Sequence, residues 1–232
     1  TLVEAGVPEW RVFTVHSSTD PELFVNAEAP PGLRAELGIP EDALVIGNIG
    51  ALVGHKDHDN LLKAARIVRD KIPRAWFVIV GAGPLHEQLM EKARALHMAD
   101  RLTMTGFRKD VPELIRIFDL FALSSSEEGI CSTLVETAIS GCPIVAANAG
   151  GVAEVVVPEE TGIIVPTRKP HALAQGIIKL ARNPELARRY AQKGRARALA
   201  HFTCDRMTER TLEVYGKVLS DEIGPENPVG YL

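Results

Sequence analysis

The chain has 232 residues, of which 30 are acidic and 26 are basic, so its formal net charge is −4. Apolar residues make up 46% and charged residues 24%, which is the balance of an ordinary globular domain. This charge, and the lack of a basic cluster along the sequence, argue against a nucleic-acid partner, and no apolar run is long enough to span a bilayer. The three cysteines (Cys131, Cys142 and Cys204) form no CxxC pair, which favours a reducing, cytoplasmic location.

Short apolar runs alternate with helical patterns along most of the chain. The predicted strands lie at 11–16, 43–50, 75–83, 101–106, 120–125, 142–148 and 162–166. The predicted helices between them lie at 59–70, 85–96, 111–118 and 132–140, and helical patterns continue from about residue 170. This order predicts an α/β fold: a Rossmann-like, doubly wound parallel sheet flanked by helices, with a helical C-terminal segment.

Ligands of such sheets bind beyond the carboxyl ends of the strands, so the loops at these ends carry the candidate residues. In the first loop, Gly50 permits close backbone approach and Lys56 stands just before a helix, where its ammonium could meet a phosphate. A solvated lysine is the alternative. Asp57 and Asp59 resemble a metal-binding DxD motif, but capping favours acidic residues at a helix start, so we predict no metal site.

Phe107 and Arg108 follow the strand predicted at 101–106. At a strand end, an aromatic ring could stack on a base and a guanidinium could pair with a diphosphate. An ordinary surface turn explains the two residues equally well.

The loop and helix at 124–143 contain two glutamates eight positions apart. Thr133 and Glu136 match a capping box, which predicts Thr133 as the N-cap and Glu136 reaching back to its N–H. Glu128 has no such structural explanation. Gly129 beside it lets the backbone amides of 130–133 turn outward, which makes a phosphate cradle at a helix start. An anion with a polyol on both sides, such as a nucleotide sugar, would satisfy both carboxylates.

Five sequence blocks together resemble the C-terminal half of a family 4 (group 1) retaining glycosyltransferase of the GT-B fold. They are "GALVGHKDHDNLL" (50–62), "FVIVGAGPL" (77–85), "MTGFRKDVPEL" (104–114), "SEEGICSTLVETAISGCPIVAANAGGVAEVV" (126–156) and "TGIIVP" (161–166). The resemblance implies that Lys56 and Glu128 are catalytic, with Lys56 on the donor diphosphate and Glu128 on the donor sugar. It further implies that Glu136 holds the ribose, that Phe107 and Arg108 lie by the base, and that the diphosphate meets the turn of Gly129, Ile130, Cys131, Ser132 and Thr133.

The chain departs from the family pattern at two places in these loops. Ala51 stands where many members have an arginine, so one diphosphate cation is missing or comes from Arg108 or another segment. Ile130 and Cys131 replace the usual Phe-Gly after the first glutamate, which places a bulkier residue in the turn.

The resemblance also implies a domain organisation and a set of partners. Residues 1–40 are expected to be a junction with an N-terminal domain that this chain lacks, 41–220 the nucleotide-sugar-binding domain, and 221–232 a loose tail. The implied partners are a nucleotide sugar, an acceptor that is a sugar, lipid or small molecule, and the missing domain, which activity would require. No metal or other cofactor is expected, and peripheral contact with the inner membrane face is compatible with lipid acceptors.

Three other interpretations remain open from the sequence. The chain could be a nucleotide-sugar epimerase of the same fold, a fragment that binds nucleotide sugar without catalysis, or an α/β domain without a ligand.

Overall fold

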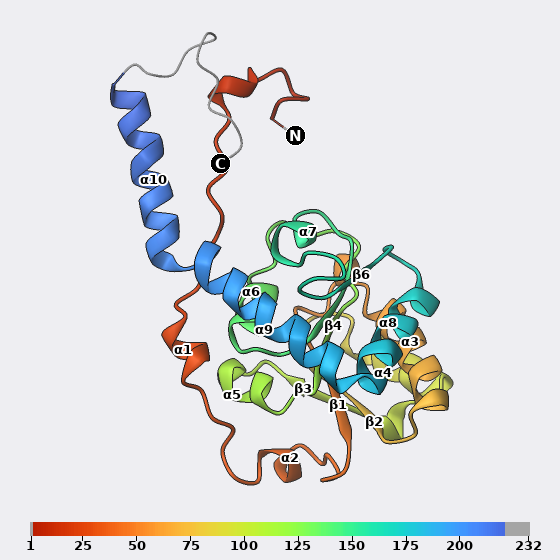
Figure 1. Cartoon of the computed structure of the whole chain (residues 1–232). Helices are drawn as coiled ribbons and strands as arrows, with labels where there is room; N and C mark the ends of the chain where they lie inside the picture. Colours follow the sequence, from red (N-terminus) through yellow and green to blue (C-terminus); the bar gives the residue numbers. More distant parts are fainter. Residues whose placement is uncertain (1, 221–232) are drawn as a thin grey trace.

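The computed structural model describes residues 2–220, and within this range six parallel strands form one sheet (Figure 1). The strand order across the sheet is β3-β2-β1-β4-β5-β6. The strands are β1 (Leu44–Ile49), β2 (Ala75–Val80), β3 (Leu102–Gly106), β4 (Leu120–Leu123), β5 (Ile144–Ala147) and β6 (Ile163–Val165). The predicted Rossmann-like parallel sheet is therefore confirmed.

Helices cover both faces of this sheet. One layer contains α3 (His58–Lys71), α4 (His86–Ala95) and α8 (Pro170–Arg182). The opposite layer contains α5 (Val111–Arg116), α6 (Ser132–Ile139) and α7 (Val152–Val155). The long helix α9 (Pro184–His201) crosses between them: Tyr190 packs with the α8 layer and Ala198 with the α6 layer. The remaining elements are η1 (Glu9–Arg11), α1 (Glu22–Val25), α2 (Leu33–Glu36), η2 (Gly54–Lys56), η3 (Ala99–Arg101) and α10 (Cys204–Leu219).

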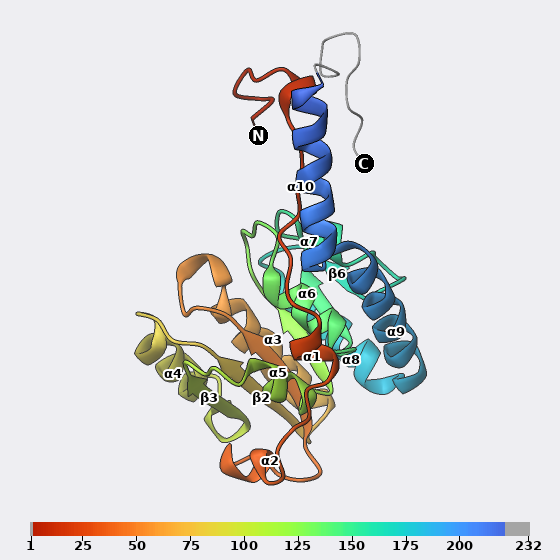
Figure 2. The same ribbon diagram turned by 90° about the vertical axis from the view of Figure 1, so that its left-hand side faces the viewer.

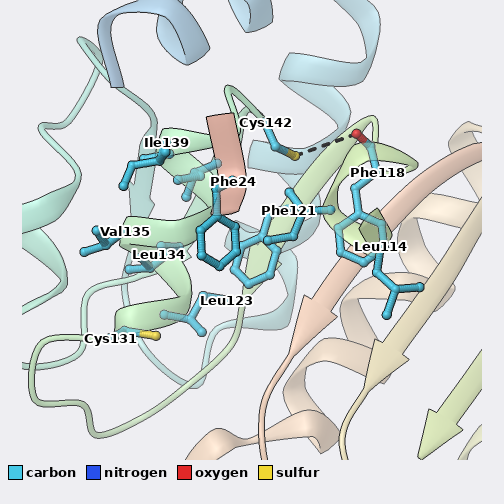
Figure 3. Close-up of a cluster of buried hydrophobic side chains, with 14 of the residues drawn as sticks. Phe24, Leu114, Phe118, Phe121, Leu123, Cys131, Leu134, Val135, Ile139 and Cys142 are labelled. Atoms are coloured by element: carbon cyan, nitrogen blue, oxygen red, sulfur yellow. Dashed lines mark hydrogen bonds between the residues drawn. The ribbon is translucent and has the colours of Figure 1, made fainter. Parts of the chain in front are cut away.

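Successive side chains of each strand point to opposite faces of the sheet, and this divides the core into two clusters. In β1, Val45 belongs to the cluster under α5 and α6, whereas Ile46 belongs to the cluster under α3 and α8. Both clusters are apolar because a parallel sheet between two helix layers has no face in water. Figure 3 shows the first cluster, in which Phe24 of α1 points toward Phe121 and Leu134. The segment predicted as a junction, 1–40, thus contributes Phe24 and Leu33 to this core.

The segment before α1 and the helix α10 both project from the same side of the domain (Figures 1 and 2). No side chain of α10 is buried. The two segments meet at their bases, where Thr19 forms an isolated bridge with Thr203 and Ser18 Oγ lies 3.4 Å from Met207 Sδ.

The strand predicted at 11–16 is wrong. Residues 12–16 have no regular secondary structure, and η1 ends at Arg11. β-branched residues become a strand only when a neighbouring strand supplies hydrogen bonds, and this segment has none beside it. The tail predicted at 221–232 lies outside the described residues. Over residues 2–220, no helix is both long enough and apolar enough to cross a membrane.

Candidate active site

The candidate site lies where the strand order reverses. The chain proceeds from β1 outward to β2 and β3, and then returns to β4 on the other side of β1. The carboxyl ends of β1 and β4 therefore form the topological switch point, which is where open α/β sheets bind ligands. Lys56 stands in the loop after β1, and Glu128 stands in the loop after β4.

Lys56 and Glu128 form a direct ion pair. The Lys56 Nζ atom lies 2.6 Å from Glu128 Oε1, and the two side chains are 19% and 8% exposed. Ser125 Oγ donates a second hydrogen bond to the same carboxylate oxygen at 2.6 Å. A carboxylate this deeply buried must be paired and hydrogen-bonded, and these two donors supply both requirements. The structure thus brings together the two residues predicted to be catalytic.

Hydrogen bonds to two backbone carbonyl groups hold the loops after β1 and β4 against each other. Ser124 Oγ donates to the carbonyl oxygen of Lys56 at 2.8 Å, and the Ser126 amide donates to the carbonyl oxygen of His55 at 2.8 Å. Sequence analysis missed this role of the serines. Their signal was a run of three small polar residues directly after the buried strand β4, at the ligand-binding end of the sheet.

A third loop, after β5, packs against the backbone of Glu128 and Gly129. Gly150 has a φ of +50°, and a Cβ atom there would lie 1.8 Å from the carbonyl oxygen of Glu128. A Cβ at Gly151 would lie 2.8 Å from the carbonyl oxygen of Gly129. Only glycine permits this approach, so two glycines from a distant segment determine where the turn at 128–129 lies.

The backbone amides at the start of α6 are open. The helix begins at Ser132, and its N-cap residue Cys131 makes no side-chain cap hydrogen bond. The amides of 129–133 donate no backbone hydrogen bond to any carbonyl among the described residues. These N–H groups and the positive end of the helix dipole together make an anion site.

The capping box predicted at Thr133 and Glu136 is wrong. Thr133 lies inside α6, because the chain enters the helix earlier than the motif indicated, through Cys131 in an extended conformation. The carboxylate of Glu136 accepts no hydrogen bond from the rest of residues 2–220. It is half-buried, and burial raises its pKa. Glu136 is therefore available for a ligand instead of serving the helix.

The family assignment follows from comparison with known proteins. The sequence model of the glycosyl transferases group 1 family matches residues 31–197. The chain belongs to the group 1 glycosyltransferases. It is 30% identical, over 94% of its length, to the D-inositol 3-phosphate glycosyltransferase of Mycobacteroides abscessus, covering 49% of that protein. It is 26% identical, over 93% of its length, to the N-acetyl-alpha-D-glucosaminyl L-malate synthase of Bacillus anthracis, covering 56%.

Among solved structures, HepE of Anabaena in complex with UDP and glucose superposes with a TM-score of 0.84. The match covers 93% of this chain and 59% of HepE. At 24% identity it shows that the two chains share a fold. The chain spans about half the length of the curated relatives it matches.

In this member of the group 1 family, the turn residues that depart from the family pattern pack inward. The Cys131 side chain is 4% exposed and lies in the core cluster beside Leu123 and Leu134 (Figure 3). Burial, and secondarily the charge of Glu128, raise the pKa of its thiol, so it stays neutral. All three cysteines are free thiols.

Phe107 and Arg108 lie to one side of the ion pair. They follow β3, which is two strands from β1, or roughly 10 Å across the sheet. Phe107 is 72% exposed. Arg108 is held by Asp110 (Nη2 to Oδ2, 2.6 Å) and Glu36 (Nη1 to Oε1, 2.8 Å), and these carboxylates raise its pKa. Its charge is therefore already balanced, and the structure does not bring it to Lys56 or Glu128.

The two acidic residues near Lys56, Asp57 and Asp59, cap helix α3 and form surface ion pairs. Asp57 is the N-cap of α3, and its side chain accepts from the Asn60 amide at 3.3 Å, as the capping prediction required. Asp59 pairs with Lys63 and with Lys92. Within the part of the chain that the structure describes, no three His, Cys, Asp or Glu side chains cluster as metal ligands.

His58 joins the Lys56 loop to the sheet and was also missed by sequence analysis. It is 2% exposed, and its Nε2 lies 3.0 Å from Asn48 Oδ1, while Asn48 Nδ2 donates to the Ala122 carbonyl at 2.8 Å. Since the Asn48 oxygen accepts, Nε2 carries the proton. Nδ1 has no hydrogen-bond partner among the described residues. Burial, and then the charge of Lys56, lower the His58 pKa to about 4.

Acidification is therefore expected to destabilise the domain through His58. The unfolded state binds a proton near the ordinary pKa of 6.5 and the folded state only near 4, so stability falls as pH drops between these values. The free energy of unfolding at pH 5 should be about 2 kcal/mol lower than at pH 7 from this group. Urea denaturation at both pH values measures it. His58→Gln should reduce the loss, and the exposed control His171→Gln should not; an equal loss in all three proteins would contradict the assignment.

Proposed function

We propose that this chain binds a nucleoside diphosphate sugar and supports transfer of the sugar to an acceptor hydroxyl with retention of anomeric configuration. One observation carries the proposal: the Lys56–Glu128 ion pair lies at the switch point of the sheet, one turn from the open amides of α6. A cation, a set of unpaired N–H donors and a buried carboxylate suit a ligand with a diphosphate next to a polyol.

The ion pair can remain in contact while the donor binds. The Lys56 ammonium has three N–H donors, and Glu128 uses one of them, so others are available for a phosphate oxygen. On Glu128, Oε1 accepts from both Lys56 and Ser125, whereas Oε2 is left to accept from sugar hydroxyls. In this arrangement Lys56 contacts the diphosphate and Glu128 orients the sugar.

These same groups would favour the transition state. As the glycosidic bond breaks, the diphosphate leaving group gains negative charge next to Lys56 and the amides of 129–133. The sugar ring gains oxocarbenium character, which the carboxylate of Glu128 offsets. The scheme includes no metal ion or other cofactor, because fixed N–H donors and Lys56 are placed to stabilise the leaving group.

The nucleoside would extend across the sheet toward β3. Glu136, half-buried and without an internal hydrogen bond, is proposed to accept from the ribose hydroxyls. The base would then reach the side of the site where the exposed ring of Phe107 follows β3. The UDP and glucose complex of HepE, a structural relative, supports a nucleotide and a sugar as ligands of this fold. The acceptor would be a sugar, a lipid or a small molecule, and its binding is a property of the whole protein.

Titration calorimetry of the 232-residue chain with UDP, GDP and ADP tests donor binding, with one nucleotide site expected. Glu136→Gln is expected to weaken the preferred nucleotide about tenfold or more, because hydrogen bonds to a charged acceptor stabilise more than those to a neutral amide. Glu91→Gln, an exposed change on α4, is the matched control. Absence of heat with all three nucleotides would exclude the proposed site.

The chemical outcome is tested separately on the complete polypeptide. NMR of the product should show the anomeric configuration of the donor. An inverted product would overturn the retaining assignment, and release of a free sugar epimer without acceptor would favour an epimerase instead.

A further inference from the structure

A cavity of about 600 Å³ lies at the amino ends of the strands, whereas the candidate active site lies at their carboxyl ends. Leu44, Leu120 and Pro143 line it at the amino ends of β1, β4 and β5. Since β1 has six residues, this cavity is about 20 Å from the loops that carry Lys56 and Glu128. It is therefore a separate place on the molecule, and a ligand bound there is independent of the proposed function.

Four arginines from three segments line the cavity: Arg74, Arg116, Arg188 and Arg195. Two of them reach only neutral carbonyl groups. Arg74 Nη1 donates to the Asp42 carbonyl at 3.2 Å, and Arg116 Nη1 donates to the Ser140 carbonyl at 2.9 Å. Arg188 and Arg195 have no hydrogen-bond or ion-pair partner within residues 2–220. No carboxylate of the described chain pairs with any of the four guanidinium groups.

Asp119 is the one acidic residue of the described chain that lines this cavity. Its Oδ2 accepts from the Val45 amide at 2.7 Å and lies 3.5 Å from Arg34 Nη2, so a fifth arginine outside the cavity shares its charge. The cavity thus concentrates positive charge in a chain whose formal net charge is −4. Like charges around a shared space repel, and a bound anion would relieve that repulsion.

The floor of the cavity is apolar. Besides Leu44, Leu120 and Pro143, it includes Leu180, Ala187 and Ala191. One face of α9 supplies both kinds of group, because Ala187 and Arg188 precede Ala191 by four and three positions and Arg195 follows it by four. Guanidinium groups around an apolar floor suit an anion that also carries a ring or an alkyl portion.

We propose that this cavity binds a phosphate ester, with the phosphate on Arg188 and Arg195 and the apolar portion against the floor. A guanidinium matches phosphate oxygens in a bidentate geometry, and these two side chains have no competing partner in the described chain. A free phosphorylated metabolite and the headgroup of a phospholipid share this chemistry.

The probe for the site is inorganic pyrophosphate, titrated into the ¹⁵N-labelled 232-residue chain and followed by ¹H–¹⁵N NMR. Amide signals of 140–142, 144 and 185–195 are expected to shift. Arg188→Gln/Arg195→Gln should weaken these shifts about tenfold or more, as expected for two lost charge-assisted hydrogen bonds. Arg182→Gln/Arg189→Gln is the matched control, because neither residue lines the cavity, and the spectrum of each variant reports its folding.

Lys56→Ala separates this site from the donor site, since it should leave the shifts at 185–195 unchanged. Shifts confined to 129–133, shifts that persist in Arg188→Gln/Arg195→Gln, or no shifts at all would overturn the proposal. Vesicles of phosphatidylcholine with and without phosphatidylglycerol identify the source. Sedimentation with the anionic vesicles that is lost in the same double variant supports a lipid headgroup. Pyrophosphate binding without vesicle binding supports a soluble phosphate ester.

Discussion

Replacing Lys56 by alanine is expected to lower the turnover number of sugar transfer by about 100-fold or more. Lys56 is the cation that reaches the buried carboxylate of Glu128, 2.6 Å away, beside the open amides at the start of α6. Without it, the charge that develops on the leaving diphosphate loses its closest proposed counter-charge. The measurement is kcat at saturating donor on the complete polypeptide. Lys63→Ala, which removes a surface lysine paired with Asp59, is the matched control.

Because Lys56 and Glu128 form an ion pair, the loss of stability in Lys56→Ala must be separated from the loss of turnover. Lys56→Ala leaves the Glu128 carboxylate, which is 8% exposed, with Ser125 as its one remaining side-chain donor among the described residues, and an unpaired buried charge destabilises the fold. The double variant Lys56→Met/Glu128→Gln removes both charges and should recover the stability lost in Lys56→Ala without recovering turnover. Near wild-type kcat in Lys56→Ala and in Glu128→Ala would refute the proposed roles.

Substitution of Gly150 by alanine should damage both the fold and donor binding. The new Cβ would lie 1.8 Å from the Glu128 carbonyl oxygen, so the backbone of the turn at 128–129 must shift. The φ of +50° adds about 1–2 kcal/mol of strain for a non-glycine residue. Together these effects should lower the free energy of unfolding by about 3 kcal/mol or more, which urea denaturation measures.

Gly106→Ala separates the clash from the strain. Gly106 has a φ of +71°, but no atom lies within 4 Å of the place that a Cβ would take there, so only the backbone strain should remain. Nucleotide affinity should fall at least tenfold in Gly150→Ala and change little in Gly106→Ala. Equal losses in the two variants would show that the contact with Glu128 does not position the turn.

The sheet and its covering helices could be predicted because their sequence patterns are local. The runs at 43–50 and 142–148 are apolar throughout most of their length, since both sheet faces are buried, and helical spacing marks 59–70 clearly. The run at 11–16 is also rich in β-branched and aromatic residues, yet it forms no strand because no strand lies beside it. Whether such a run becomes a strand depends on a neighbour that the local sequence does not contain.

The candidate site was predictable as a set of residues but not as a set of contacts. Lys56 and Glu128 stand 72 positions apart, and their ion pair follows only from the parallel order that places β1 beside β4. Glu136 matched a capping box, but the motif cannot tell where the helix begins, and Cys131 takes the cap position. The arginines of the second cavity come from three segments: Arg188 and Arg195 lie in one basic stretch of α9, but only the fold brings Arg74 and Arg116 beside them.

Crystals of the chain soaked with a nucleoside diphosphate sugar test the central claim most directly. We predict that density for the diphosphate lies on the amides of 129–133, with Lys56 Nζ within hydrogen-bond distance of a phosphate oxygen and Glu128 facing the sugar. Donor density elsewhere on the molecule, with none beside Lys56, Glu128 and the amides of 129–133, would contradict it.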